Sequence, residues 1–568
     1  MPFIIKRSYI NPAKAWFVFL LMKQLNALEY LKLNKFQRFL YDFKQFFCAI
    51  PGWFKGLILA FLGLVKDFAI KIKDGFLDII HTFVKGNWAV KLSFVIFGLG
   101  NIYYGQIARG ILFFLFEVAF VVYMFFIPTS VDVSSGLPNY RTQSGLNWLK
   151  SVNWFETGNT VGTIQQKPGY DYEYDVPITI PGEDSTRVLF NALLAVIFII
   201  AFIVTWRMQV KQCRICMDIT ASGKKIKSGK DDLKSLLDDQ FHKTLLAPSI
   251  IGIGLFTVLP MIFMIIIAFT NYSDVFGSIG LLNGQSELYQ WVGFKNLAEL
   301  LNFSEGGIGV AFGELLVWTL IWAVFATFTN YFLGMMVAIM INKKGIKIKK
   351  FWRTVLVMTI AIPQFVSLLY ISKMFDFNGF IGSFLYNNVP FIRDYLVANN
   401  TNTLWQVPEA ARIMLIVINI WVGIPYVMLM ATGILMNIPA DLYESAQIDG
   451  ANGVQQFTKI TLPYMLFVTG PYLLTSFVGN LNNFNIIFLL SGGGPTNFDM
   501  NIPSLEGLVP GHTDLLITWL FKLSTGSGAG ARYYLASALG ILIFLVVAIL
   551  SLIVYNVIPS TKNEEDFA

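Results

Sequence analysis

Residues 437–463 read Asn-Ile-Pro-Ala-Asp-Leu-Tyr-Glu-Ser-Ala-Gln-Ile-Asp-Gly-Ala-Asn-Gly-Val-Gln-Gln-Phe-Thr-Lys-Ile-Thr-Leu-Pro. This segment is polar and punctuated by glycine, and it stands between two long apolar runs, 411–436 and 464–489. A helix of about 20 apolar residues crosses the ~30 Å hydrocarbon core of a bilayer. The arrangement therefore predicts a short polar loop held at one membrane face between two spans.

The loop has an internal skeleton of fixed spacing, which is Glu444-Ser445-Ala446, three residues, Gly450, nine residues, then Ile460-x-Leu462-Pro463. We expect residues 441–448 to form a short helix, because its acidic first turn suits the positive end of the helix dipole. Gly450 then supplies a turn. Pro463 opens the next membrane helix, where a missing N–H costs little.

The composition of the whole chain agrees with a membrane location. Its 568 residues are 55% hydrophobic and only 14% charged, and the mean hydropathy is +0.60. A soluble chain of this size would carry more charge. The net charge of +7 does not indicate nucleic acid as a partner, because the basic residues flank the apolar runs, where they act as topology signals.

Eight stretches are long and apolar enough to span a bilayer. They cover approximately residues 111–128, 188–206, 245–269, 312–341, 353–373, 411–436, 464–489 and 533–557. The sequence thus predicts an all-α polytopic membrane protein with about eight transmembrane helices. A further apolar run at 92–104 is short and broken by glycine. If it crosses the membrane, a span near 56–65 must accompany it, and the count rises to about ten.

Lysine and arginine assign the loops to the two sides of the membrane, because they accumulate on the cytoplasmic side. Segments 207–244 and 342–353 are rich in both residues, and 342–353 contains no acid. By contrast, segment 270–311 offers only Lys295 as a base. Residues 437–463 then face the cytoplasm.

Residues 1–91 form a basic region that ends in a helical polar stripe. The stripe consists of Asp67, Lys71, Asp74, Asp78, His81 and Lys85. The other face of the same helix is apolar, which is typical of a helix lying in the membrane interface and attracted to anionic lipid. We therefore expect amphipathic helices on the cytoplasmic leaflet. Whether residues 46–107 cross the membrane stays open.

The two apolar runs that flank the loop carry polar residues at helical spacing. These are Asn419, Gly423 and Tyr426 before the loop, and Ser476, Asn480 and Asn483 after it, at i, i+4 and i+7 in each run. Amides and hydroxyls near the rings of Trp421, Tyr426 and Phe484 suit a neutral sugar, and no fixed charge stands among them to bind an ion. Hydrogen bonds that hold one helix to another explain the same residues equally well.

The sequence indicates neither a catalytic nor a metal site. Three histidines are scattered through different segments. Residues 223–231 resemble a phosphate loop, but with one residue too many and Asp231 where the magnesium-binding Ser or Thr should stand. Cys213 and Cys216 lack a second ligand pair, so their role stays open. Glu117 lies within the first confident span, either as a proton relay or as a structural partner at a helix interface.

The spacing of residues 437–463 resembles the "EAA" loop, the cytoplasmic coupling loop of permease subunits in binding-protein-dependent ABC importers. Ser445 departs from the usual alanine but is equally small. Three segments are also similar to the larger permease of maltose and maltodextrin importers, the MalF type: 291–296, 419–426 and 444–495. The similarity covers roughly residues 245–557. The loop between 269 and 312 is short, whereas the enterobacterial relative has a large folded domain there.

This resemblance implies an ABC importer permease fold. Its core would be 245–557 with the coupling loop at 437–463, followed by a cytoplasmic tail at 558–568. Outside the region of similarity, the apolar runs and the charge of the loops predict accessory spans within 92–244, with an outer loop at 129–187 and a cytoplasmic loop at 207–244. The implied sugar-lining residues are Asn419, Gly423, Tyr426, Ser476, Asn480 and Asn483. The implied ATPase-coupling residues are Glu444, Ser445, Ala446 and Gly450.

The implied function is that of a non-catalytic, multi-pass permease subunit of an ATP-driven oligosaccharide importer in the bacterial cytoplasmic membrane. Implied partners are a second homologous permease, two ATPase subunits that hold ATP and Mg, an extracellular sugar-binding protein, an oligosaccharide and the lipid bilayer. No cofactor and no metal are expected in this chain. The sugar and its chain length are not identified.

The alternatives to an importer permease are a secondary transporter and a membrane scaffold or sensor. A secondary transporter would need an acid pair or a cation site within the membrane, and only Glu117 is a candidate. A membrane scaffold or sensor would not need aligned polar residues on both helices that flank the loop.

Overall fold

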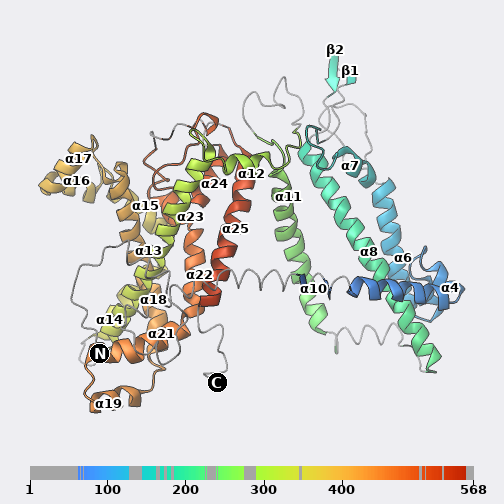
Figure 1. Cartoon of the computed structure of the whole chain (residues 1–568), viewed down its shortest axis with the longest axis horizontal. Helices are drawn as coiled ribbons and strands as arrows, with labels where there is room; N and C mark the ends of the chain where they lie inside the picture. Colours follow the sequence, from blue (N-terminus) through green and yellow to red (C-terminus); the bar gives the residue numbers. More distant parts are fainter. Residues whose placement is uncertain are drawn as a thin grey trace, which may run out of the picture. The chain divides into compact units, whose positions relative to one another are not determined.

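The structure is a computed structural model that describes residues 70–126, 144–161, 185–223, 241–273, 289–343, 348–497, 507–526 and 530–557, together with two strands and a few residues between these blocks. Its regular elements are helical, apart from an antiparallel hairpin of β1 (Lys167–Asp171) and β2 (Val176–Ile180) (Figure 1). The predicted all-α class is therefore confirmed, with one small hairpin added in the expected outer loop 129–187.

The chain divides into two compact units. The first comprises Met1–Phe120 and Ile199–Gln240, and the second comprises Val121–Phe198 and Phe241–Ala568. The boundary passes through two long helices, α6 (Ile107–Val121) and α8 (Ser185–Ala221). This division follows packing, so the division of the sequence by membrane topology, at residues 91 and 244, stays a prediction.

Six helices among the described residues are long and apolar enough to cross a membrane, namely 107–126, 185–221, 244–267, 308–342, 408–435 and 533–552. Two further candidates are bent pairs. Helix α14 (Lys349–Ala361) meets α15 (Gln364–Met374) at 92°, and Gly453–Val468 meets α22 (Gly470–Leu481) at 63°. Counting each pair as one span gives eight, as predicted. The expectation of continuous spans at 353–373 and 464–489 was wrong, because Pro363 and Gly470-Pro471 interrupt them.

The second unit is built around α13 (Ile308–Asn342) and α18 (Pro408–Leu435). It also contains the β1–β2 hairpin, the start of α8, and α14, α15 and α22. Its other elements, in chain order, are η1 (Val122–Phe126), α7 (Gly145–Ser151), α10 (Phe241–Ile253), η2 (Gly254–Val258), α11 (Leu259–Ile267), α12 (Lys295–Leu300), α16 (Phe380–Asn388), α17 (Pro390–Ala398), η3 (Leu404–Gln406), α19 (Ala440–Ile448), α20 (Gly453–Gln456), η4 (Phe457–Thr461), α21 (Leu462–Val468), α23 (Phe484–Leu490), η5 (Pro503–Leu505), α24 (Leu516–Thr525) and α25 (Tyr533–Val557).

Small residues let α13 and α18 approach closely. A Cβ on Gly334 of α13 would stand 2.6 Å from Cβ of Val427 on α18, so only glycine fits there. Tyr331 and Met335 are buried in the same cluster as Val427 and Met428. Since lipid provides no hydrophobic force between helices, van der Waals packing of this kind holds them together. Helix α13 is thus a central scaffold of the second unit.

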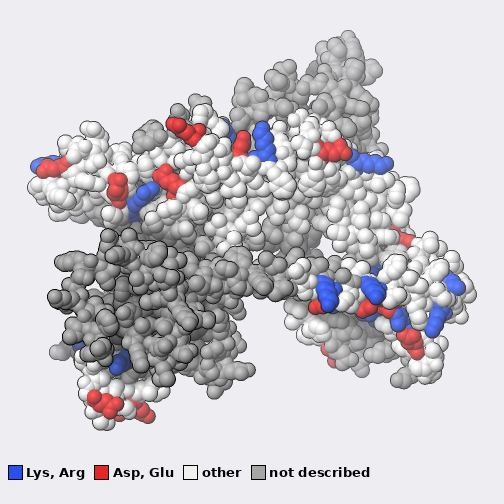
Figure 2. All heavy atoms as spheres, in the orientation of Figure 1, with Lys and Arg blue, Asp and Glu red and all other residues white. Residues whose placement is uncertain are grey.

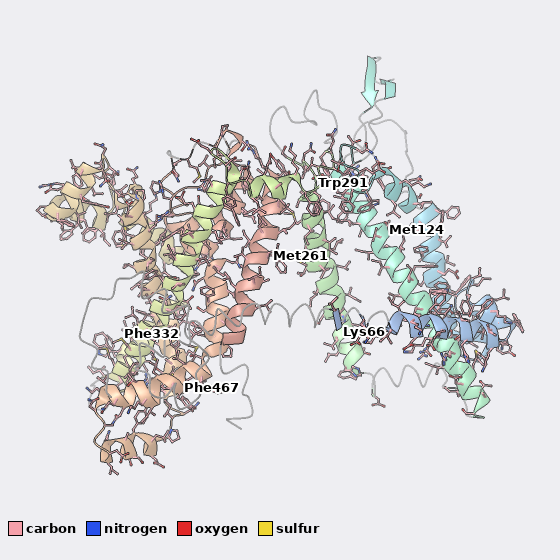
Figure 3. All side chains as sticks on the ribbon, viewed as in Figure 1. Lys66, Met124, Met261, Trp291, Phe332 and Phe467 are labelled. Carbon is pink, nitrogen blue, oxygen red and sulfur yellow. The ribbon has the colours of Figure 1, made fainter. Side chains whose placement is uncertain are left out.

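The segment 291–296 fixes the end of α11. Trp291 is buried and donates from Nε1 to the carbonyl of Val152 at 2.9 Å; it stands among side chains near α7 and the start of α8 (Figure 3). Asn296 donates from Nδ2 to the carbonyls of Ala268 and Thr270 at 2.8 and 2.7 Å. These carbonyls have no partner within the helix, so Asn296 satisfies them. The motif has a structural role here.

In the first unit, residues 70–85 form a helix, followed by α4 (Trp88–Leu92) and α5 (Leu99–Tyr103). The helix is amphipathic, as predicted, with large apolar side chains such as Phe76 exposed. The middle of its polar stripe is only partly exposed, however, because Asp78 forms ion pairs with Arg207 and Arg214 of α8. Most of the expected N-terminal region 1–91 lies outside the described residues.

Helix α8 also corrects the expected loop 207–244, whose first part continues the helix to Ala221. Cys213 and Cys216 lie on this extension as buried thiols, 3.6 Å from side-chain oxygens of Asn101 and Gln106 respectively. Ion pairs to Asp78 and burial of the thiols explain why the helix persists beyond the apolar run. These contacts give both cysteines a packing role.

Candidate solute path and coupling segment

Helices α13 and α22 join two of the predicted polar residues in one hydrogen-bonded chain. Asn480 donates from Nδ2 to Oγ1 of Thr327 on α13 at 3.0 Å. Asn483 donates from Nδ2 to Oδ1 of Asn480 at 3.2 Å. Asn480 is therefore oriented from both sides. Each amide still has a second N–H or lone pair for another partner.

Asn483 does not lie on the same helix as Ser476 and Asn480, so the expected i+7 stripe is wrong at its last position. Helix α22 ends at Leu481, and Asn483 is the N-cap of α23, where its side chain accepts from the N–H of Ile486 at 3.4 Å. The side chain of Asn483 nevertheless lies next to Asn480, because its amide turns back toward that residue.

Gly423 lies against a residue that the sequence reasoning missed, Asn330 of α13. A Cβ on Gly423 would collide with the carboxamide of Asn330. Oδ1 of Asn330 is buried and has no hydrogen-bond partner among the described residues. Thr327 and Asn330 stand three residues apart on α13, so one helix face contacts both predicted stripes. The sequence did contain a signal for Thr327 and Asn330, since they are two polar residues at helical spacing within a long apolar run.

The remaining predicted residues differ in how far their side chains are exposed. Asn419 is buried, and its Nδ2 lies 3.5 Å from the carbonyl of Ala326 on α13, so it packs between helices. Tyr426 is 56% exposed, with its ring tilted against that of Tyr472 at 6.1 Å between centroids. Ser476, Asn480 and Asn483 are half-buried. Only part of the predicted set is therefore open to a solute.

Two of the aromatic residues chosen from the sequence stand apart from this set. Trp421 is two residues from Asn419, about 200° around the helix, and therefore on the opposite face. Phe484 stacks on Phe488 at 4.8 Å and contacts Phe521. Tyr426 and Tyr472 are the aromatic residues that adjoin the polar groups.

The break between α21 and α22 is tied to α13 just beyond Asn330. Thr469 is buried at the break, where its hydroxyl donates to the carbonyl of Met465 at 2.6 Å and lies 2.8 Å from the hydroxyl of Tyr331. Gly470 and Pro471 follow it. Proline removes a backbone donor from the next turn. The bend between α21 and α22 therefore lies beside a polar contact to α13.

The predicted coupling helix is present as α19. None of its side chains is buried: Glu444 and Ser445 are exposed and Ala446 is half-buried. Ile448 at its end is 86% exposed. Helix α19 projects from the end of the second unit opposite α12 and α24 (Figure 1), and acidic side chains gather over it (Figure 2). The described chain therefore leaves this helix uncovered.

Gly450 has a φ of +77° and no atoms close to the position of a Cβ, so its backbone conformation requires glycine. Asn452 and Gln455 then form a capping box that starts α20. Pro463 stands in the first turn of α21, as predicted, although α21 continues directly from α20 and η4. The helix already begins at Gly453, and Pro463 follows the π-helical turn η4, which accommodates its missing N–H.

After α23, residues 491–497 pack against residues 511–514. Gly493 has a φ of +83°, and a Cβ there would collide with the carboxylate of Asp514. Asp514 accepts hydrogen bonds from the N–H of Gly511 and the hydroxyl of Thr518, both at 2.8 Å, and pairs with Lys522 at 2.5 Å. Burial raises the pKa of Asp514, and the Lys522 ammonium opposes that rise. The absence of a side chain at Gly493 thus allows the backbone to pack closely against Asp514.

No group of three metal-ligating side chains is brought together within the part of the chain that the structure describes. Glu117, the acid of the first span, accepts a hydrogen bond at 2.8 Å from the N–H of Phe97. That bond satisfies a backbone donor at the turn before α5, which is the structural role weighed in the sequence. The geometry supports neither a cation site nor an acid pair there.

Comparison with known proteins agrees with this architecture. Residues 330–563 match the family described as the inner membrane component of binding-protein-dependent transport systems. The maltodextrin transport system permease protein MdxF of Bacillus subtilis (strain 168) is 33% identical over 395 residues, which cover 68% of this chain and 85% of that protein. The chain belongs to this family of transport-system membrane components. It is a non-catalytic, multi-pass permease subunit of a bacterial ABC importer.

Two further relatives extend the comparison. The maltodextrin transport system permease protein MalC of Streptococcus pneumoniae serotype 4 (strain ATCC BAA-334 / TIGR4) is 30% identical over 483 residues, 83% of this chain and 96% of that protein. The galactooligosaccharides transport system permease protein GanP of Bacillus subtilis (strain 168) is also 30% identical, over 385 residues, 68% of this chain and 86% of that protein.

Proposed function

We propose that this permease subunit forms half of a membrane path for a neutral oligosaccharide of the maltodextrin class. The observation that carries the proposal is the partly exposed polar patch of Tyr426, Ser476, Asn480 and Asn483 beside the break in α21–α22. Polar groups on a membrane helix must meet protein, water or solute. This patch contains amides and hydroxyls but no charge, as sugar hydroxyls require.

The substrate class draws support from the relatives. MdxF and MalC are named for maltodextrin, and GanP for galactooligosaccharides, at similar identity to this chain. All three names specify neutral oligosaccharides. The tilted rings of Tyr426 and Tyr472 offer the flat apolar surface that the C–H face of a glucose unit prefers.

The same proposal assigns the partners. A second homologous permease would cover the exposed side of the patch. Two ATPase subunits with ATP and Mg would contact α19, and α19 would transmit their movement to the bent helices. A sugar-binding protein would deliver the oligosaccharide at the opposite end of the second unit. Exposed Ile448 and the acidic side chains over α19 support the ATPase contact.

Reconstitution tests this function. The chain is expressed with the neighbouring transporter genes of its source, purified in detergent, and placed in liposomes loaded with ATP. We expect an ATPase to co-purify and maltodextrin uptake to depend on ATP and on added binding protein. ATP-dependent uptake of galactooligosaccharides in place of maltodextrins would overturn the substrate class. Uptake driven by an ion gradient without ATP would overturn the mechanism.

A further inference from the structure

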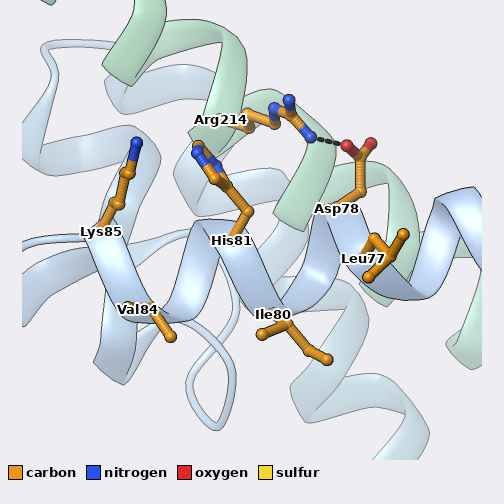
Figure 4. A pocket seen from close by; sticks show the side chains of 7 residues that line it. All are labelled: Leu77, Asp78, Ile80, His81, Val84, Lys85 and Arg214. Carbon is orange, nitrogen blue, oxygen red and sulfur yellow. Dashed lines mark ion pairs between the residues drawn. The ribbon is translucent and has the colours of Figure 1, made fainter.

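A hollow of about 470 Å³ lies in the first unit beside the helix 70–85. Its polar lining is Asp78, His81, Lys85 and Arg214, and its apolar lining includes Ile80 and Val84. Lys85 and His81 project to the side of the helix on which Arg214 lies, whereas Ile80 and Val84 project from the other side (Figure 4). The hollow therefore joins a charged surface to an apolar one.

The charged side of the hollow carries an excess of positive charge. Asp78 is the acid in its lining, and it is neutralised by ion pairs to both Arg214 and Arg207, the latter at 3.3 Å. Lys85 is exposed and has no ion-pair partner among the described residues. Nδ1 of His81 is buried and likewise has no hydrogen-bond partner in the described part of the chain. These groups are arranged for an anion that accepts several hydrogen bonds.

The apolar side indicates what kind of anion fits. Ile80 is 45% exposed and Val84 is 66% exposed, so neither is covered by the described chain. Arg207 and Arg214 lie toward the basic end of α8, a membrane-crossing helix, where the positive-inside bias places the cytoplasmic interface. A free phosphate would leave this apolar surface in water. A phospholipid matches both surfaces at once.

We propose that this hollow binds the phosphate of an anionic phospholipid of the cytoplasmic leaflet. Lys85 and His81 contact the phosphate, Arg214 is held in place by Asp78, and the acyl chains lie along Ile80 and Val84. The site ties the amphipathic helix to one lipid molecule. It adds to the diffuse attraction between basic helices and an anionic surface.

The test uses a matched pair of lysines on the same helix. Lys71 and Lys85 are both exposed, but only Lys85 lines the hollow. The full-length chain, with the subunits that co-purify, is stripped of lipid and titrated with phosphatidylglycerol, and bound lipid is counted by native mass spectrometry. We expect Lys85→Gln to bind it roughly tenfold more weakly, the effect of losing one charge-assisted hydrogen bond. Lys71→Gln should match the parent, and His81→Ala should resemble Lys85→Gln.

Three results would overturn the proposal. Equal losses in Lys71→Gln and Lys85→Gln would show diffuse attraction of charge without a site. Unchanged binding in Lys85→Gln and His81→Ala would show that the lipid binds elsewhere. Displacement of phosphatidylglycerol by an equal concentration of inorganic phosphate would show a site for a free anion. Circular dichroism of each variant checks that the helix is intact.

Discussion

Two kinds of membrane helix stand side by side in the second unit, and they differ in how much of themselves they bury. Helix α13 is continuous over 35 residues, and half of its most apolar window is buried. The α21–α22 pair is bent by 63° and leaves Ser476 and Asn480 only half-buried. The continuous helix is thus a scaffold, while the broken one leaves two polar side chains partly exposed.

The comparison also shows how the two kinds of helix are connected. Thr327, Asn330 and Tyr331 of α13 contact Asn480, Gly423 and Thr469 respectively. One face of the scaffold therefore touches the partly exposed polar patch, the neighbouring helix α18 and the bend of the broken helix. The coupling segment runs directly into α21 through α20 and η4.

Breaking that connection gives the largest expected effect. Gly450→Val places a β-branched residue at a φ of +77°, at a cost of about 2–3 kcal/mol. We expect the turn after α19 to rearrange, so that ATP hydrolysis continues while sugar uptake in proteoliposomes falls by up to about a hundredfold.

The matched control is Gly453→Val. Gly453 stands at the start of α20 with open space around it and without a positive φ, so valine is tolerated. Normal uptake by a stably inserted Gly450→Val variant would remove the idea that this turn transmits motion.

Contact between the two continuous helices gives the next effect. Gly423→Ala drives a methyl group into the carboxamide of Asn330 and should destabilise the α13–α18 packing by about 1–2 kcal/mol. Gly433→Ala, on the same helix, meets nothing within 4 Å and should be neutral or slightly stabilising. Thermal unfolding of the purified variants measures the difference.

A double variant sharpens this result. Adding Asn330→Ala to Gly423→Ala removes both the collision and the buried, unpartnered Oδ1 atom. We therefore expect it to recover most of the lost stability. Equal melting of the Gly423→Ala and Gly433→Ala variants would contradict the close approach.

The sequence predicted the helices better than their breaks. Apolar runs and the Glu444–Gly450 spacing were sufficient to place all eight spans and α19, because burial in lipid and a fixed turn leave few alternatives. The bends were missed although Pro363 and Gly470-Pro471 mark them. Proline is tolerated in membrane helices when neighbours satisfy the freed groups, so its presence alone does not distinguish a bend from a straight span.

The solute path was predicted in part for a related reason. Helical spacing found Gly423 and Asn480, but it gave Asn483 a place on α22 that the break removes. It did not reveal that Asn419 is buried, because spacing defines a face and not what covers it. Thr327 and Asn330 were missed because their apolar run was read only for its length.

Variants of Thr327 and Asn480 distinguish two roles for the polar residues of the candidate path: contact with sugar, or hydrogen bonds that only hold helices together. Asn480→Ala should lower uptake about fivefold, equivalent to ~1 kcal/mol for a lost hydrogen bond. Thr327→Val keeps the amide but removes its partner. If the amide serves the sugar, Asn480→Ala should reduce transport more than Thr327→Val at similar thermal stability. Equal losses of stability with unchanged transport in both would favour helix packing.

The smallest effect on uptake is expected for Glu117→Gln, on a helix that belongs to neither the scaffold nor the broken pair. Its carboxylate accepts from the N–H of Phe97, and glutamine can accept the same bond without a charge. Glu117→Gln should therefore change ATP-driven uptake by less than about twofold. Glu117→Leu, which strands the N–H, should cost about 1–3 kcal/mol of stability. If Glu117→Gln abolished uptake while melting like the parent, the carboxylate would be carrying protons, and the division between scaffold and path would have to include α6.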